Sequence, residues 1–450
     1  MSLERINIGE GINISFVESD RFKKNLVCAD IITRLEDDPK ASKNALLAKV
    51  LMRGSKNYPT MADISRRLNQ LYAAMIGCFA VKVGEAQILS FSADMLADKY
   101  ALDDTNITDE TLDVFFDILI NPLLEEGEEA GFVGEYVKSE KTNLIDEIKA
   151  QINDKNAYAY NKCVEAMCAG ERFATQNCGT ISSVEQIDPK SLYDHYKYIL
   201  SSCAIEIFCV GSFAEKKERI TQKFAEMLKG IERKKPEELE CYETDVVLSA
   251  KFKGEITEEM EVNQAKLAMG FRAGVTNKEN DEFLKFVLFD TVFATAPTGK
   301  LFCNLREKLS LCYYCYTVSE SAKGIVTVLC GIESENKDQA TEEILRQLEE
   351  IKNGNFTDSD IEAAKKADIT AYKGIFDSAG AIVGWYRNRL LCDNPKTPEQ
   401  AIEEILKLKK SDIVEAAKKL SLDTIYFLKG APGGEESEII DEIIESEEER

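Results

Sequence analysis

The chain repeats its own pattern of apolar residues at one fixed separation. Segments 45–51, 68–71 and 88–91 align with segments 282–288, 305–308 and 325–328, and 237 residues separate the partners each time. A constant separation without gaps is hard to obtain by chance from helices and strands alone. The chain is therefore expected to fold as two related lobes, with each supersecondary pattern present twice.

Each half shows the same succession of elements. Opening strands, such as 12–16 and 26–32, precede an apolar helix, a further helix and a hairpin. Long amphipathic helices follow, and the apolar residues of segment 338–348 recur at the spacing of one helical face. This combination of sheets and covering helices predicts an α+β fold of two homologous lobes, each an antiparallel-rich sheet covered by helices.

Domain boundaries follow from the repeat and from the distribution of charge. We expect an N-terminal lobe at 1–230, a linker at 231–242, a C-terminal lobe at 243–434 and an acidic tail at 435–450. The linker is charged and carries Pro236, which is typical of connections between domains. The tail is expected to be solvated, because a run of like charges repels itself.

Composition excludes several classes of partner. A net charge of −24 disfavours nucleic acid and anionic membrane, because binding to phosphates requires clustered lysine and arginine. No apolar run reaches the ~18 residues that a membrane span needs, and the first residues lack a secretion signal. The 13 scattered cysteines indicate reduced, buried thiols, so we expect a soluble cytoplasmic protein.

Two cysteines stand at a spacing that metal and redox sites use. Cys312 and Cys315 resemble half a zinc knuckle or a redox pair, but no second pair accompanies them and their surroundings favour a strand. The structural interpretation, two buried thiols of a strand, is therefore preferred.

The sequence contains a single histidine, His195, in a stretch that predicts a helix. A zinc site with two histidines cannot be built from it, and no nucleophile motif stands nearby. His195 is therefore expected to be an ordinary residue on a helix surface.

Four stretches together resemble the insulinase-like (pitrilysin, M16) zinc peptidases. They are VLMRGSK at 50–56, EKTNLIDEI at 140–148, the segment from GTISSV at 179–184 to AIEIFCVGSF at 204–213, and GKLFCNLREK at 299–308 with Cys312 and Tyr313. The resemblance spans nearly the whole chain. It implies a LuxS/MPP-like fold of two lobes forming a half-clamshell.

The resemblance places the metal signature of this family, H-x-x-E-H, on residues that cannot perform its chemistry. Its positions fall on Ala45, Ala48 and Lys49, while the third ligand matches Glu147 and an outer carboxylate matches Glu140. A lone carboxylate cannot hold zinc or activate water, so no cofactor is expected in this chain. We instead expect the Lys49 ammonium to lie in the metal region and to pair with a half-buried Glu147.

Other family positions depart less from the pattern. Arg306 and Tyr313 match the residues that the family supplies from the opposite wall to hold substrate and to stabilise an oxyanion. The substrate strand of the family matches Ile76, Gly77 and Cys78, where an extended peptide would add to a sheet edge. Isoleucine and glycine replace the usual polar edge there, which puts family-type recognition in question.

The resemblance implies one of two roles. The first is a bacterial non-zinc subunit that forms a heterodimer with a zinc-bearing M16 homologue, supplies Arg306 and Tyr313, and cleaves peptides or unfolded polypeptides only with that partner. Such inactive subunits include some associated with modification of elongation factor P. The alternative is a catalytically dead scaffold or peptide-binding protein, which would act as a homodimer or with other partners. A glycine-loop recognition subunit fits less well, since 293–300 holds one glycine.

Overall fold

The computed structural model describes residues 3–36, 39–125, 131–296 and 298–430. The chain divides into two compact units, each formed from separate stretches of sequence. The first unit takes Met1–Ala150, Gly170–Asp245 and Thr370–Ala401, and the second takes Gln151–Ala169, Val246–Ile369 and Ile402–Arg450. The predicted acidic tail lies outside the described residues.

The first unit is built on one mixed sheet. In the described residues this sheet has six strands in the order β1-β2-β6-β3-β5-β4, in which only the β2–β6 pair is parallel. β4 stands at the edge of the sheet and pairs with β5 along its whole length. The strands are β1 (Glu4–Gly9), β2 (Ile12–Glu18), β3 (Lys24–Arg34), β4 (Met75–Val83), β5 (Ala86–Leu96) and β6 (Ala204–Gly211).

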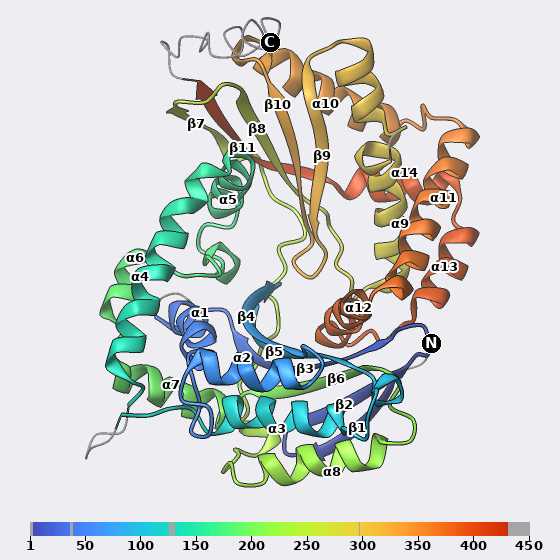
Figure 1. The fold of residues 1–450 in the computed structure, drawn as a ribbon. Helices are drawn as coiled ribbons and strands as arrows, with labels where there is room; N and C mark the ends of the chain where they lie inside the picture. Colours follow the sequence, from blue (N-terminus) through green and yellow to red (C-terminus); the bar gives the residue numbers. More distant parts are fainter. Residues whose placement is uncertain (1–2, 37–38, 126–130, 297, 431–450) are drawn as a thin grey trace, which may run out of the picture. The chain divides into compact units, whose positions relative to one another are not determined.

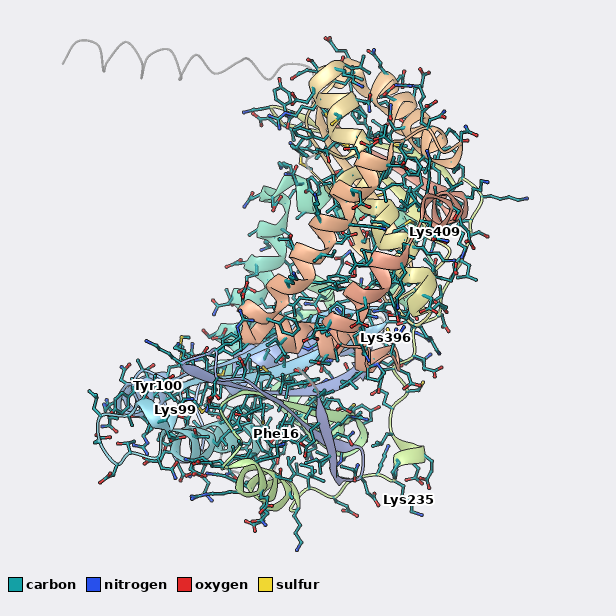
Figure 2. The ribbon with its side chains drawn as sticks, turned by 90° about the vertical axis from the view of Figure 1, so that its right-hand side faces the viewer. Phe16, Lys99, Tyr100, Lys235, Lys396 and Lys409 are labelled. Atoms are coloured by element: carbon teal, nitrogen blue, oxygen red, sulfur yellow. The ribbon has the colours of Figure 1, made fainter. Side chains whose placement is uncertain are left out.

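Seven helices of the described residues cover one face of this sheet. The core between them is apolar, and Phe16 lies within it (Figure 2). Phe16 is 2% exposed, and its ring is edge-on to that of Phe213. Because β-strand side chains alternate between the two faces, one row of each strand supplies this core. The helices are α1 (Lys40–Leu51), α2 (Met61–Gln70), α3 (Ile107–Ile120), α4 (Gly134–Ala150), α6 (Ile181–Gln186), α7 (Pro189–Ser202) and α8 (Lys217–Leu228).

A helix from far along the chain covers the opposite face of the same sheet. α12 (Ala379–Leu391) packs Ile382, Val383 and Tyr386 against β2, β3 and β6, and Figure 1 shows it on the side away from α3 and α8. The guanidinium of Arg387 donates two hydrogen bonds to the buried carboxylate of Asp30 on β3. The sheet of the first unit is thus covered on both faces.

The second unit repeats this plan around a smaller sheet. The described residues form five strands in the order β7-β11-β8-β10-β9, in which β7 and β11 are parallel. The remaining pairs are antiparallel, and β9 occupies an edge. The strands are β7 (Gly254–Met260), β8 (Ala265–Arg272), β9 (Cys312–Glu320), β10 (Ile325–Ile332) and β11 (Ser421–Gly430).

The helices of the second unit lie mostly in the second half of the chain. One core lies between the sheet and α9, α10 and α14, and the face opposite carries α5 (Lys155–Met167), which buries Ala159 and Cys163 against the sheet (Figure 1). The others are α9 (Asn280–Asp290), α10 (Lys337–Lys352), α11 (Asp358–Gly374), α13 (Pro398–Lys407) and α14 (Lys410–Lys419). The amphipathic helix predicted at 338–348 is thereby confirmed as part of α10.

The compact units differ from the sequential lobes expected at 1–230 and 243–434. Segment Gln151–Ala169, which carries α5, belongs to the second unit, and segment Thr370–Ala401, which carries α12, belongs to the first. Helical periodicity shows that such a helix has an apolar face but does not show which sheet covers it. The linker also packs against the first unit, where Arg233 donates to the carbonyls of Leu200 and Cys203.

None of the helices in the described residues combines the length and the apolar character that a bilayer crossing requires.

Candidate functional site

The helix that matches the metal signature is α1, and its inward face is apolar. Ala45 and Ala48 are buried at 7% and 4% exposure. Lys49 lies at the edge of this face, and its Nζ is 2.6 Å from Oε1 of Glu147 on α4. The expected pairing is therefore present. The side chain of Glu147 is 55% exposed near the end of α4, so water solvates part of its carboxylate.

The outer carboxylate is the more buried of the two. Glu140 lies about two turns before Glu147 on α4, and its side chain is only 10% exposed. Nη1 of Arg53 donates to its Oε1 at 3.0 Å, and Asn143 donates to its Oε2 at 3.0 Å. The Arg53 guanidinium also lies over the ring of Tyr136. Arg53 and Asn143 thus satisfy the carboxylate of Glu140 with hydrogen bonds, and the bond to Arg53 links α4 to the end of α1.

The residues at this position do not fit zinc. Methyl groups and an ammonium replace the two imidazoles and the general base, and the remaining carboxylate is already bound to the ammonium. Burial is the main cause that raises the pKa of the nearby Cys178 thiol. The charge of Glu147 raises it further, and the charge of Lys49 lowers it. In the described residues no group of three or more histidine, cysteine or acidic side chains is arranged to hold a metal.

His195 does not lie on a helix surface, and that prediction is wrong. It is 8% exposed, and its Nε2 lies 2.7 Å from Oδ1 of Asn44 on α1. Nδ2 of Asn44 donates to Thr33 and Gln87, so its oxygen must accept and Nε2 of His195 carries the hydrogen. Burial lowers the pKa of His195 to about 3, aided by the charges of Lys43 and Lys40. The imidazole is therefore neutral.

The buried network continues from His195 to the sheet edge. Nε2 of Gln87 donates to the carbonyl of Asn177 at 2.7 Å, and Nδ2 of Asn177 donates to the carbonyl of Ala80 on β4 at 2.8 Å. Sequence reasoning missed these residues. A signal existed for His195, because it lies three residues after Leu192 and four before Ile199, on the apolar stripe of α7.

The predicted substrate strand is the edge strand β4. Peptide groups alternate in direction along a strand, and the contact with Asn177 shows that the carbonyl of Ala80 points away from β5. The unbroken register between β4 and β5 carries this alternation back to Cys78 and Ile76, whose peptide groups also point to the open edge. Gly77 points its peptide group toward β5. The side chains of Met75 and Phe79 are exposed on one face of this edge.

Arg306 and Tyr313 lie in the second unit, near a sheet edge. Arg306 lies in a π-helical segment (Phe302–Lys308), and its half-exposed guanidinium lies over the ring of Phe302. Such segments are uncommon and occur often at functional sites. Tyr313 lies near the start of β9 and is 59% exposed.

A β-bulge sets the direction of Tyr313. Gly331 pairs with Tyr314 and Ile332 pairs with Cys312, so Tyr313 is the extra residue between them. Bulges of this kind redirect a side chain and are frequent beside active sites. The bulge also explains how Cys312 and Cys315 are both buried although three positions separate them. The preferred interpretation of these cysteines as buried thiols of a strand agrees with their position.

The hydroxyl of Tyr313 has an acidic partner. It donates to Oε1 of Glu333 at 2.9 Å. This hydrogen bond and the charge of Glu333 raise the pKa of Tyr313 above its usual value, so the phenol remains a proton donor near neutral pH. To donate to a developing oxyanion, the phenol must exchange Glu333 for the substrate oxygen.

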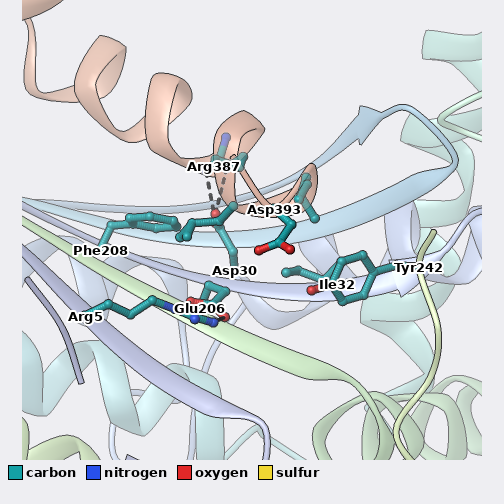
Figure 3. Close-up of a pocket in the computed structure, with 10 residues that line it drawn as sticks. Arg5, Asp30, Ile32, Glu206, Phe208, Tyr242, Arg387 and Asp393 are labelled. Atoms are coloured by element: carbon teal, nitrogen blue, oxygen red, sulfur yellow. Dashed lines mark hydrogen bonds and ion pairs between the residues drawn. The ribbon is translucent and has the colours of Figure 1, made fainter. Parts of the chain in front are cut away.

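A cavity of ≈ 50 Å³ lies in the first unit beneath the end of α12 (Figure 3). Two buried carboxylates face it, but each is held by an arginine. Asp30 accepts from Arg387, and Glu206 accepts from Arg5 and Asn13. Figure 3 shows that Asp393 and Tyr242 also reach toward this space. The paired charges attach α12 and β1 to the sheet and account for the polar lining.

Comparisons with known proteins match part of the chain to a family model and nearly all of it to a relative. Residues 186–367 match the family model of the peptidase M16 inactive domain. The probable inactive metalloprotease YmfF of Bacillus subtilis (strain 168) is 29% identical over 423 residues, which cover 94% of this chain and 97% of that protein.

Solved structures share the fold. A conserved protein from Enterococcus faecalis V583 superposes with a TM-score of 0.87 at 25% identity, covering 97% of this chain and all of that chain. A peptidase M16 inactive domain from Pseudomonas fluorescens superposes with a TM-score of 0.77 at 14% identity, covering 96% and 99%. Residues 186–367 thus match the peptidase M16 inactive domain, and the chain is similar along nearly its whole length to a probable inactive metalloprotease.

Proposed function

We propose that this chain is the non-zinc subunit of a cytoplasmic, two-chain M16-type peptidase. Its partner is a zinc-bearing M16 homologue, and the substrate is a peptide or an unfolded polypeptide. Arg306 holds a substrate carbonyl, and Tyr313 donates to the oxyanion that forms during cleavage. The chain by itself has no peptidase activity.

One observation carries this proposal: the two halves of the family's site have diverged to different extents. At the metal position an ammonium is bonded to the remaining carboxylate. Tyr313, by contrast, keeps an exposed phenol on a bulge, and Arg306 keeps a half-exposed guanidinium. A site shared with a partner chain needs both groups accessible from outside, as they are here.

The chemistry of the pair suits acyl transfer. A zinc ion held by the partner would supply the activated water and the Lewis acid for the scissile carbonyl. A guanidinium gives charge-assisted donors that orient a backbone carbonyl. A phenol that stays protonated near neutral pH can donate to negative charge as it develops, and removal of one such donor typically costs roughly 10²-fold or more in kcat. The hydrogen bond and the charge of Glu333 raise the pKa of Tyr313 further above the neutral range.

The test is a reconstitution with a zinc-bearing M16 homologue from the same genome. The two chains are purified together, and cleavage of a quenched fluorescent peptide library is followed. Tyr313→Phe is expected to lower kcat by roughly 10²-fold, and Arg306→Ala is expected to raise KM and lower kcat.

Two neighbouring residues provide matched controls. Tyr316 is a partly exposed tyrosine on the same strand, and Lys308 is a cation in the same helical segment. Tyr316→Phe and Lys308→Ala should leave both kinetic constants unchanged. If the mixed chains cleave peptide and both Arg306→Ala and Tyr313→Phe match the wild type, the shared site does not exist.

A second candidate function, peptide binding without cleavage, is favoured by the edge strand β4. The peptide groups of Ile76 and Cys78 point to the open edge, where an extended peptide can continue the sheet. Cys78→Pro removes one outward N–H without touching the ladder to β5, so it should weaken peptide binding while the fold persists. Met75→Ala is the matched control, because it changes an exposed side chain of β4 and keeps every edge N–H.

Fluorescence anisotropy with a labelled unfolded polypeptide reads out this second candidate. Loss of binding in Cys78→Pro, with Met75→Ala less affected, supports a peptide-binding role. Equal binding by wild type and Cys78→Pro would remove β4 from consideration.

A further inference from the structure

Two cysteines face one another across the strand pair β9–β10. Cys315 on β9 is directly opposite Cys330 on β10 in the antiparallel register. Both are buried in the core of the second unit, at 5% and 1% exposure. The sequence drew attention to Cys312 and Cys315, but the structure assigns Cys330 as the partner of Cys315.

The backbone places this pair at a position suited to a covalent link. The N–H of Ala273 donates to the carbonyl of Gly324 at 2.8 Å, which fixes the direction of the peptide groups along β10. The β8–β10 register is unbroken from Ile325 to Ile332, so every second residue after Gly324, including Cys330, directs its peptide group toward β8. Cys330 and Cys315 are therefore a non-hydrogen-bonded pair.

Non-hydrogen-bonded pairs bring opposite residues closest together. Their Cα atoms lie roughly 4.5 Å apart, within the ~4.4–6.8 Å range that disulfides require. The side chains agree with the backbone, because the two Sγ atoms lie 2.7 Å apart, closer than two sulfur atoms approach without a bond. Backbone and side chains thus independently place the thiols for oxidation.

We propose that Cys315 and Cys330 form a reversible cross-strand disulfide when the protein meets a low-molecular-weight disulfide. One cysteine thiolate attacks a sulfur of the oxidant and releases one small thiol. The other cysteine thiolate then attacks the mixed disulfide and releases the second small thiol. Two protein thiols lose their protons and are oxidised, and the small disulfide is reduced to two thiols.

The reaction requires the edge of the sheet to open. Burial raises the pKa of the Cys330 thiol well above its usual value, and the thiolate is the reactive form. Among the described strands β9 has a neighbour on one side only, so local opening of this strand exposes the pair. Oxidation is consequently slow, and the product ties β9 to β10 two residues beyond Tyr313. This inference does not depend on the proposed peptidase role.

Peptide mapping tests the proposal directly. Native protein is incubated with oxidised glutathione, free thiols are alkylated, and a digest is analysed by mass spectrometry. The expected product is a peptide pair linked through Cys315 and Cys330, with the loss of two alkylatable thiols and their recovery after dithiothreitol. Amide hydrogen exchange across β9 should slow in the oxidised wild type.

Variants separate this link from other oxidations. Cys330→Ala and Cys315→Ala should each abolish the link, whereas Cys303→Ala in the same unit should retain it. The wild-type digest is itself decisive if a variant fails to fold. A link between Cys312 and Cys315, or alkylation of both Cys315 and Cys330 while the exposed Cys241 has formed a mixed disulfide, overturns the proposal.

Discussion

The ammonium of Lys49 lies 2.6 Å from a carboxylate oxygen of Glu147, at the position where the family resemblance places a metal ion. The pair joins α1 to α4. Both side chains are partly exposed, in contrast to the neighbouring pair of Arg53 and Glu140, whose carboxylate is 10% exposed.

The difference in burial predicts different energetic effects. Lys49→Met should lower the free energy of unfolding by less than about 1 kcal/mol, because water solvates the Glu147 carboxylate that remains. Arg53→Met should cost more, about 1–3 kcal/mol, because it leaves Glu140 with Asn143 alone. Urea unfolding of both variants measures the order, and a larger loss for Lys49→Met would contradict it.

His195 should make stability depend on pH. Its pKa is about 3 in the folded protein and 6.5 as an unperturbed group, so the unfolded chain binds a proton that the folded chain does not. The neutral imidazole therefore contributes fully above pH 6.5, and its contribution falls as the pH drops toward 3. Between pH 7 and pH 5 the loss amounts to about 2 kcal/mol.

His195→Gln isolates this contribution, since an amide can still donate to Asn44 but does not titrate. The free energy of unfolding of wild type minus variant should decrease between pH 7 and pH 5. A difference that stays constant with pH would show that the imidazole is not buried.

Arg272 and Asp423 form a fully buried ion pair in the second unit, with Nε and Oδ2 2.8 Å apart. Asp423→Ala should cost about 3–5 kcal/mol, because it leaves the Arg272 charge buried without this carboxylate. The double variant Arg272→Met with Asp423→Leu should recover much of that loss, since no charge is then left buried. Urea midpoints of the two variants provide the comparison, and equal midpoints would contradict it.

Glu333 should control the ionisation of Tyr313. Glu333→Gln removes the negative charge that raises the pKa of Tyr313, so the phenol should lose its proton at lower pH than in the wild type. Carbon NMR of ring-labelled tyrosine, assigned with Tyr313→Phe, follows the titration. Glu335→Gln is the matched control, since Glu335 lies on the same connection but does not contact Tyr313 in the described hydrogen bonds. An unchanged midpoint in Glu333→Gln would contradict the contact.

The sequence predicted those features that depend on pattern alone. The duplicated arrangement of segments predicted two α+β units. The contact of Lys49 with Glu147 was expected from the family resemblance, which places both residues at metal positions. The burial of His195 could have been predicted from its place between Leu192 and Ile199 on one helical face. The surface position was expected instead because no second histidine or nucleophile motif gave the imidazole a role.

Other features depend on tertiary contacts and were beyond sequence reasoning. The bulge at Tyr313 arises because Gly331 pairs with Tyr314 and Ile332 pairs with Cys312. The residue types at these positions do not predict a bulge. Cys315 and Cys330 lie opposite each other because of the register between β9 and β10. The sequence of a short hairpin does not distinguish this register from one shifted by a residue.

The exchange of segments between the two units has a consequence for synthesis. α12 supplies Ile382, Val383 and Tyr386 to the first unit, although most of that unit is complete in sequence by Asp245. A chain emerging from the ribosome therefore holds one apolar face of its first sheet uncovered while more than a hundred further residues are translated. Folding of the first unit can finish only late in translation, and a gene cut at the linker would yield two incomplete proteins.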